Sequence, residues 1–132
     1  MGVFQPGLLI DFACEDVADV TLNDANPEED LATVEVEAQS AGNTVWFTAY
    51  VTWVPSNASR PFTLRIERED GSVVCVALDS PTAAQQPITT AITCCDVVDE
   101  AGSFTYRLVG ERQDPTDIDI EEGTFTAAVI NT

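Results

Sequence analysis

The residues of this chain that could do chemistry are acids and thiols. The sequence contains 23 Asp and Glu, four Cys and five Arg, with no lysine and no histidine. Imidazole and amine groups are the commonest general bases, Schiff-base formers and nitrogen ligands for metals. The sequence also has no glycine-rich phosphate loop and no G-x-S-x-G turn. We therefore predict a structural or binding module rather than an enzyme, with no catalytic residue.

The best-spaced carboxylates are Asp117, Asp119 and Glu121, which alternate and would line one face of a strand. Oxygen ligands of this kind suit Ca²⁺. The segment lacks the spacing and the glycine of an EF-hand loop, however, and a solvated acidic loop is the favoured interpretation. We therefore predict no metal and no other cofactor, with Ca²⁺ at these three residues as the weaker alternative.

The four thiols are Cys14, Cys75, Cys94 and Cys95, and no pair has the C-x-x-C spacing of a zinc site. Neighbouring residues of a strand point to opposite faces, so at most one of Cys94 and Cys95 can face a core. The cysteines are either small buried residues plus one exposed thiol, or crosslinks between subunits in an oxidising setting. Three full intramolecular pairings are possible, and the sequence does not choose between them.

The charge of the chain restricts its partners. A formal charge of -18 on 132 residues repels phosphate, which argues against nucleic acid and against an anionic membrane surface. No apolar run reaches the 18 residues of a membrane span, and the N-terminus has no basic region of the kind that begins a signal peptide. We expect a single domain that reaches an outer location without a signal peptide.

The segments that position these residues are short, and apolar and polar side chains alternate along them with no helical periodicity. Asp70-Gly71 lies at the centre of a predicted hairpin turn. The fold class predicted is all-β, a single sandwich of seven to eight strands over residues 11–132, as a jelly roll or alternatively an immunoglobulin-like sandwich. The strands are predicted at residues 17–22, 31–38, 44–54, 62–68, 73–78, 88–95, 103–109 and 123–130.

Two features are typical of subunit contacts. Residues 1–10 form a predicted arm, apolar at Phe4, Leu8, Leu9 and Ile10 and interrupted by proline and glycine. Such an arm either adds to its own sheet or docks on a neighbouring subunit. The strand 44–54 carries aromatic side chains on both faces, which predicts that a second subunit covers the face with Trp46 and Tyr50. The same two rings could stack on a sugar.

Several segments together resemble a known family. They are Val45-Trp46-Phe47-Thr48-Ala49, Phe62-Thr63-Leu64-Arg65-Ile66-Glu67-Arg68, Ile88-Thr89-Thr90-Ala91-Ile92, Tyr106-Arg107-Leu108 and Gly123-Thr124-Phe125-Thr126-Ala127. Their order resembles small jelly-roll proteins without signal peptides from spore-forming bacteria, some of which build endospore appendages. The resemblance implies an N-terminal connector that reaches a neighbouring subunit and is locked by disulfides, a part that Cys14 could play. This chain has no paired cysteines in its first ten residues, so the covalent form of that linkage does not carry over directly.

We therefore expect a structural protein that assembles with itself, through its arm and its sheet edges, into an extracellular or spore-surface fibre. Added strands would supply backbone hydrogen bonds, and head-to-tail contacts of this kind give open filaments. One alternative is a capsid-decoration or tail module of a virus or phage, which would place the chain on a virion. Another is a carbohydrate-binding module that uses its exposed aromatic rings.

Overall fold

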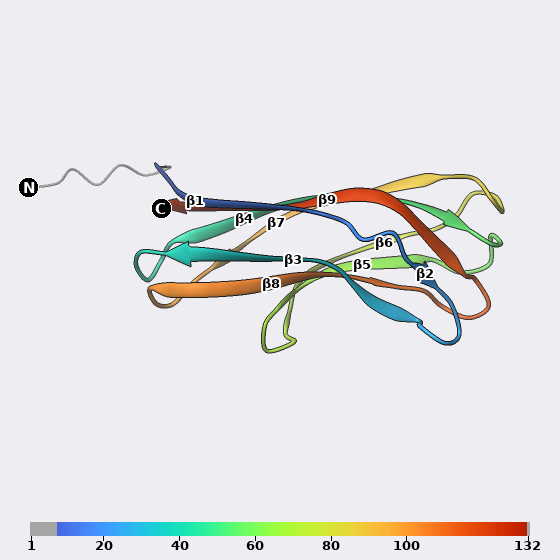
Figure 1. Cartoon of the computed structure of the whole chain (residues 1–132), viewed down its shortest axis with the longest axis horizontal. Coiled ribbons are helices and arrows are strands. Elements are labelled where there is room, and N and C mark those ends of the chain that lie inside the picture. Colours follow the sequence, from blue (N-terminus) through green and yellow to red (C-terminus); the bar gives the residue numbers. More distant parts are fainter. Residues whose placement is uncertain (1–7, 132) are drawn as a thin grey trace, which may run out of the picture.

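The structure is a computed structural model that describes residues 8–131. These residues form two antiparallel sheets packed face to face, with Leu8 at the start of β1 paired to Asn131 at the end of β9 (Figure 1). The strands are β1 (Leu8–Asp16), β2 (Thr21–Leu22), β3 (Glu28–Ala38), β4 (Thr44–Pro55), β5 (Phe62–Arg68), β6 (Val73–Asp79), β7 (Ile88–Val97), β8 (Gly102–Glu111) and β9 (Ile118–Asn131). No helix able to cross a membrane occurs among the residues described.

The two sheets are made by rolling up one long hairpin. Leaving out the two-residue β2, the first strand pairs with the last (β1 with β9), the second with the seventh (β3 with β8), the third with the sixth (β4 with β7), and β5 with β6. The β4–β9 and β5–β8 pairs then join these hairpin segments into sheets ordered β1-β9-β4-β7 and β3-β8-β5-β6. This is the jelly-roll topology, and it confirms the predicted all-β sandwich.

The core lies between the sheets, and β4 shows why the sequence folds in this way. Its odd-numbered side chains from Val45 to Trp53 are at most 1% exposed, whereas Trp46 is 45% and Tyr50 is 39% exposed. Phe47 packs edge-on against Tyr106 of the opposite sheet, with ring centroids 4.6 Å apart. The alternation of side chains predicted for this strand therefore separates a face of β4 that is buried in the core from a face that points outward.

Five predicted strands differ from the structure by one to three residues at an end, and three segments differ by more. The segment 17–22 pairs as a strand only at Thr21–Leu22. The last strand begins at Ile118 rather than at residue 123, because Ile118 and Ile120 are fully buried and extend the core through the acidic segment. Within the predicted arm, Leu8–Ile10 are the first residues of β1, where Leu8 and Leu9 pair with β9. Phe4 and the rest of residues 1–7 lie outside the described residues.

Candidate interaction surfaces

The outer face of the five-stranded sheet carries few charges. Four rows of outward side chains cross β1, β9, β4 and β7, and the strand pairing fixes their order. Asp16 is the one charged side chain among them. We call this surface the low-charge face, and its rows are Leu9-Ile130-Thr44-Val97, Phe12-Ala128-Trp46-Cys95, Cys14-Thr126-Thr48-Thr93 and Asp16-Thr124-Tyr50-Ala91.

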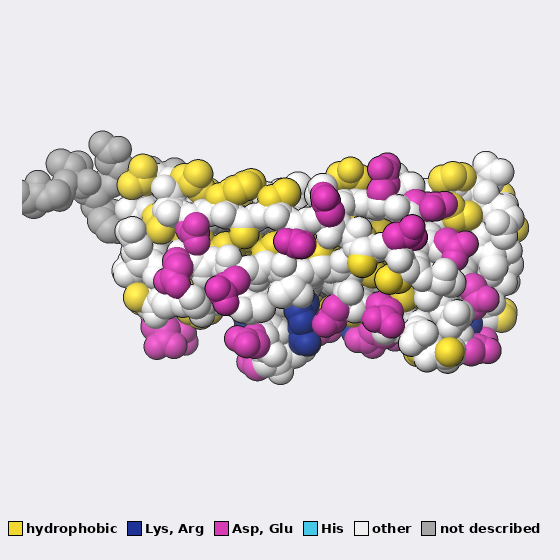
Figure 2. Space-filling view, viewed as in Figure 1, with side chains coloured by type: hydrophobic (Ala, Val, Ile, Leu, Met, Phe, Trp, Pro, Cys, Tyr) yellow, Lys and Arg dark blue, Asp and Glu magenta, His cyan; other side chains and the backbone are white. Residues whose placement is uncertain are grey.

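The apolar side chains of this face are exposed to a degree that needs explanation. Leu9 and Phe12 are each 56% exposed and Val97 is 62% exposed, in addition to the two β4 aromatics. Figure 2 shows hydrophobic side chains along the upper left edge of the molecule, where β1 and β9 lie, and acidic side chains over much of the rest. Contiguous apolar patches rimmed by polar residues mark sites of association.

The other sheet has an outer face of the opposite kind. There Arg65 contacts Glu28, Glu67 and Glu111, and Arg107 donates a hydrogen bond to Glu67 at 3.1 Å. Glu67 is therefore shared between Arg65 and Arg107. The two outer faces of the sandwich thus differ. The face of the four-stranded sheet has ion pairs among β3, β5 and β8, with exposed Val76 and Leu78 on its edge strand β6, whereas the low-charge face consists mainly of threonine, alanine and aromatic side chains.

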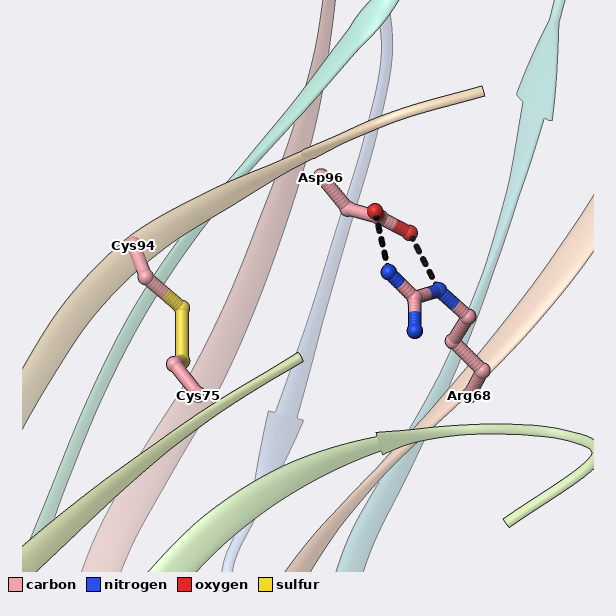
Figure 3. The surroundings of a disulfide bond; sticks show 4 residues. All are labelled: Arg68, Cys75, Cys94 and Asp96. Carbon is pink, nitrogen blue, oxygen red and sulfur yellow. Dashed lines mark hydrogen bonds and ion pairs between the residues drawn. A yellow bond between two sulfur atoms is a disulfide. The ribbon is translucent and has the colours of Figure 1, made fainter. Parts of the chain in front are cut away.

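The cysteines divide into a pair and two free thiols. Cys75 on β6 and Cys94 on β7 form a disulfide that joins the edge strands of the two sheets (Figure 3). A disulfide of this kind indicates an oxidising environment. Cys14 and Cys95 are free and exposed, and both lie on the low-charge face. Cys94 and Cys95 point to opposite sides of β7, as the strand geometry predicts.

An ion pair lies beside this disulfide. Arg68 binds Asp96 through two hydrogen bonds of 2.8 and 3.0 Å. The Tyr106 hydroxyl donates a hydrogen bond to the same carboxylate at 3.1 Å. Burial, together with the negative charge of Asp96, raises the pKa of Tyr106 well above its usual range. These contacts fix the end of β7 against the four-stranded sheet.

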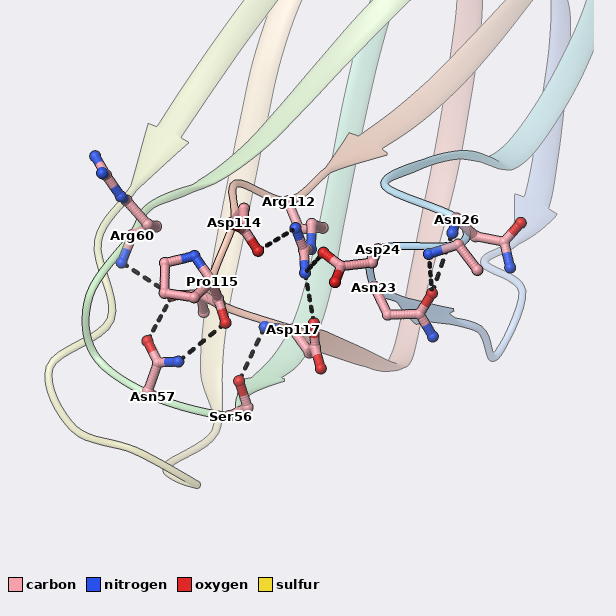
Figure 4. A network of polar contacts seen from close by, with 12 residues as sticks. Asn23, Asp24, Asn26, Ser56, Asn57, Arg60, Arg112, Asp114, Pro115 and Asp117 are labelled. Carbon is pink, nitrogen blue, oxygen red and sulfur yellow. Dashed lines mark hydrogen bonds and ion pairs between the residues drawn. The ribbon is translucent and has the colours of Figure 1, made fainter.

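The acidic candidates for Ca²⁺ occupy separate environments. Asp117 accepts a hydrogen bond from Arg112 at 2.7 Å, and the same guanidinium contacts Asp24 at 2.9 Å and Asp114 at 3.5 Å (Figure 4). Asp119 accepts a hydrogen bond from the Thr21 hydroxyl, and Glu121 is exposed. Among the residues described, no group of three or more Asp, Glu, Cys or His is arranged to hold a metal ion.

The residues predicted for a subunit interface are partly brought together. Trp46 and Tyr50 lie on the low-charge face together with Leu9, while Leu8 is exposed at the start of β1 and Ile10 packs partly against the core. The sequence did not single out Phe12, which lies in the same row as Trp46. Strand pairing creates that row, and the pairing of β1 with β9 joins residues more than a hundred positions apart.

The sequence matches no protein-family model and no curated protein. Solved structures of the same fold exist at low identity. The chain is similar to the dimeric latent PorU of Porphyromonas gingivalis, with 14% identity, TM-score 0.51, and coverage of 98% of this chain and 14% of that one. It is also similar to the Eiger TNF of S. frugiperda, with 9% identity, TM-score 0.53, and coverage of 97% and 96%.

A third similar structure is that of the T=1 particles derived from infectious bursal virus, with 6% identity and TM-score 0.55. Coverage is 88% of this chain and 31% of that one, so the chain spans less than a third of the viral protein and about a seventh of PorU. At these identities the likeness establishes the fold alone. It identifies the chain as a jelly-roll sandwich, in agreement with the order of its strands.

Proposed function

We propose that this protein is a non-catalytic structural subunit that associates with copies of itself through the low-charge face. The observation that carries the proposal is the contrast between a formal charge of -18 and a face on which Asp16 is the single charged side chain. Two copies repel each other wherever acidic surfaces meet. The low-charge face lets them approach without placing like charges opposite each other, and it buries exposed aromatic rings.

The size of the face supports a specific contact. Four strands about 4.8 Å apart and four rows about 6.6 Å apart cover on the order of 500 Å² on each copy. Two such faces together approach the roughly 1,000 Å² that a specific interface needs. The contact is therefore at the lower size limit of a specific interface, and salt that screens the acidic rims should strengthen it.

A second contact extends the assembly into a fibre. The edge strands present unpaired backbone groups, and β6 adds exposed Val76 and Leu78. A strand from a neighbouring copy that pairs there would continue the sheet. Residues 1–7, with Phe4, are the segment proposed to supply it. The disulfide supports an oxidising location, and we propose that the fibre stands on an extracellular or spore surface.

The test is the size and shape of the purified full chain, measured by light scattering and negative-stain electron microscopy at several protein and salt concentrations. Oligomers or filaments are expected. Thr48→Glu, at the centre of the low-charge face, should disperse them. Thr33→Glu is the matched control, because it places the same charge on an exposed threonine of the other sheet, beside Arg107.

Three results would count against the proposal. If the chain is a monomer at every concentration, the proposed self-assembly is wrong, and a decoration module that needs another shell protein is favoured instead. If Thr48→Glu and Thr33→Glu change the oligomer size equally, the low-charge face is not the contact. Quenching of tryptophan fluorescence by a polysaccharide, in a chain that stays monomeric, assigns Trp46 to carbohydrate binding instead. A chain that begins at Leu8 keeps all of β1 and should form oligomers but no filaments.

A further inference from the structure

We propose that the self-association is a two-fold dimer in which β4 of one copy packs over β9 of the other. This inference rests on the proposed function and specifies its geometry. The low-charge face has bulky side chains on β4, at Trp46 and Tyr50, separated by Thr48. Its neighbour β9 carries only small side chains in the same rows, namely Thr124, Thr126 and Ala128. The face is thus a ridge beside a trough.

A ridge beside a trough is self-complementary under one symmetry operation. A two-fold axis that runs along the strands, between β4 and β9, exchanges these two strands between the copies and keeps every residue in its row. Trp46 of each copy then lies over Ala128 of the other, and Tyr50 lies over Thr124. In a two-fold interface of this kind, each favourable residue contact occurs twice. The two sheets remain aligned, which is the common way for sheets to pack.

The alternative two-fold axis crosses the strands through the row of Thr48. It places β4 over β4 of the other copy, so the Trp46 ridge meets the Tyr50 ridge while the β9 troughs face each other empty. Empty space between facing side chains forfeits dispersion contacts. The axis along the strands fills the troughs with the ridges, and it places Asp16 over the uncharged Ala91.

The same axis determines where the free thiols lie. It exchanges the outer strands, so β1 of one copy faces β7 of the other. Cys14 and the Cys95 of the second copy then lie one row apart, about 6.6 Å along the strands, on sheets packed about 10 Å apart. Within one copy these thiols are three strand spacings apart, about 14 Å, across the face. The axis across the strands would place Cys14 over Cys14 instead.

The first experiment uses a short bis-maleimide crosslinker on the full chain. The wild type should give a covalent dimer, and Cys14→Ser and Cys95→Ser should each abolish it, because each crosslink needs one thiol of each kind. A covalent dimer that persists at the wild-type level in either single variant overturns the proposed axis. So does an oligomer, seen by light scattering, that gives no crosslink in the wild type.

The second experiment exchanges the ridge and the trough. Ala128→Trp should weaken self-association by about tenfold or more, because the new ring fills the space that Trp46 of the other copy occupies. The double variant Trp46→Ala, Ala128→Trp should restore it, since the ridge then stands on β9 and the trough on β4. A double variant as weak as Ala128→Trp, with an unchanged circular dichroism spectrum, overturns the arrangement.

The two levels of the proposal fail in different ways. A monomeric wild type overturns self-assembly and the dimer geometry together. An oligomer that Thr48→Glu disperses, but that crosslinks through a single kind of thiol, retains the proposed function and overturns only the axis along the strands.

Discussion

Removal of the disulfide is the perturbation whose effect can be calculated most directly. Cys75 and Cys94 are 19 residues apart in sequence and join β6 to β7, the edge strands on one side of the sandwich. No backbone pairing connects these strands, because they belong to different sheets. The disulfide is therefore the covalent link that closes that side of the sandwich. Cys75→Ser together with Cys94→Ser removes the link and leaves neither of these two residues as a free thiol.

The size of the effect follows from the closed loop. A crosslink removes conformational entropy from the unfolded chain, and for a separation of 19 residues the loss is worth about 3 kcal/mol at 25 °C. Both sulfur-bearing residues are only half-buried, so the serines add little desolvation cost. The double variant should therefore lose about 3 kcal/mol of unfolding free energy, equivalent to a fall of roughly 10 °C in Tm for a chain of this length.

The assay is urea denaturation followed by tryptophan fluorescence. Trp53 reports unfolding, because its ring is fully buried and its Nε1 donates a hydrogen bond to the Thr90 hydroxyl at 2.8 Å. Cys95→Ser is the control, since that thiol is free and exposed, and its effect should lie within about 0.5 kcal/mol. A loss below about 1 kcal/mol in the double variant, with the same denaturant slope as the wild type, would refute the loop-closure argument.

Four further predictions concern the core, a close approach, a buried hydroxyl and an ion cluster. Phe47→Ala should cost about 3–5 kcal/mol in urea denaturation, because the ring is fully buried against Tyr106 and Phe125. Gly123→Ala should destabilise far more than Gly110→Ala in thermal melting, since a Cβ at 123 would lie 2.2 Å from the Tyr50 carbonyl oxygen, whereas at 110 it would meet the movable end of Leu31 at 2.9 Å. The raised pKa of Tyr106 means that the folded state keeps this proton when the unfolded chain loses it, so stability should fall as pH rises above about 10, and a comparison of Tyr106→Phe with the wild type at pH 8 and 11 should show a smaller fall in the variant. Arg112→Leu should lower Tm at low salt and recover part of the loss at high salt, because three carboxylates then face one another without their shared cation.

Local pattern predicted every long strand except β1, because the alternation of apolar and polar side chains lies in consecutive residues of the chain. The strand 62–68 matches β5 at both ends, and the hairpin after it turns at Gly71, whose φ of +89° suits glycine. The two faces of β4 were also assigned correctly from Val45 to Trp53. In each case the information that fixes the structure lies within about ten residues of chain.

The parts that could not be predicted depend on which strands become neighbours. Ile118 and Ile120 sit in a segment whose acids outnumber its apolar residues, and only the pairing of β9 with β4 shows that the isoleucines face the core. The disulfide partner of Cys75 was open for the same reason. Phe12, Ala128 and Trp46 form one row because three strands distant in sequence meet, so the low-charge face as a whole exists only in the folded chain.

The distribution of charge is the strongest argument that the low-charge face has a partner. A chain with 23 acidic residues would spread them over both sheets if solubility alone determined its surface. The four-stranded sheet instead carries four carboxylates in contact with Arg65 or Arg107, namely Glu28, Asp30, Glu67 and Glu111, whereas the low-charge face has Asp16 at its edge strand. Exposed Trp46 and Phe12 on such a face are a cost in water unless something covers them. We propose a second copy of the chain as that partner, because the ridge on β4 and the trough on β9 have matching rows and neither carries a charge that the other would repel.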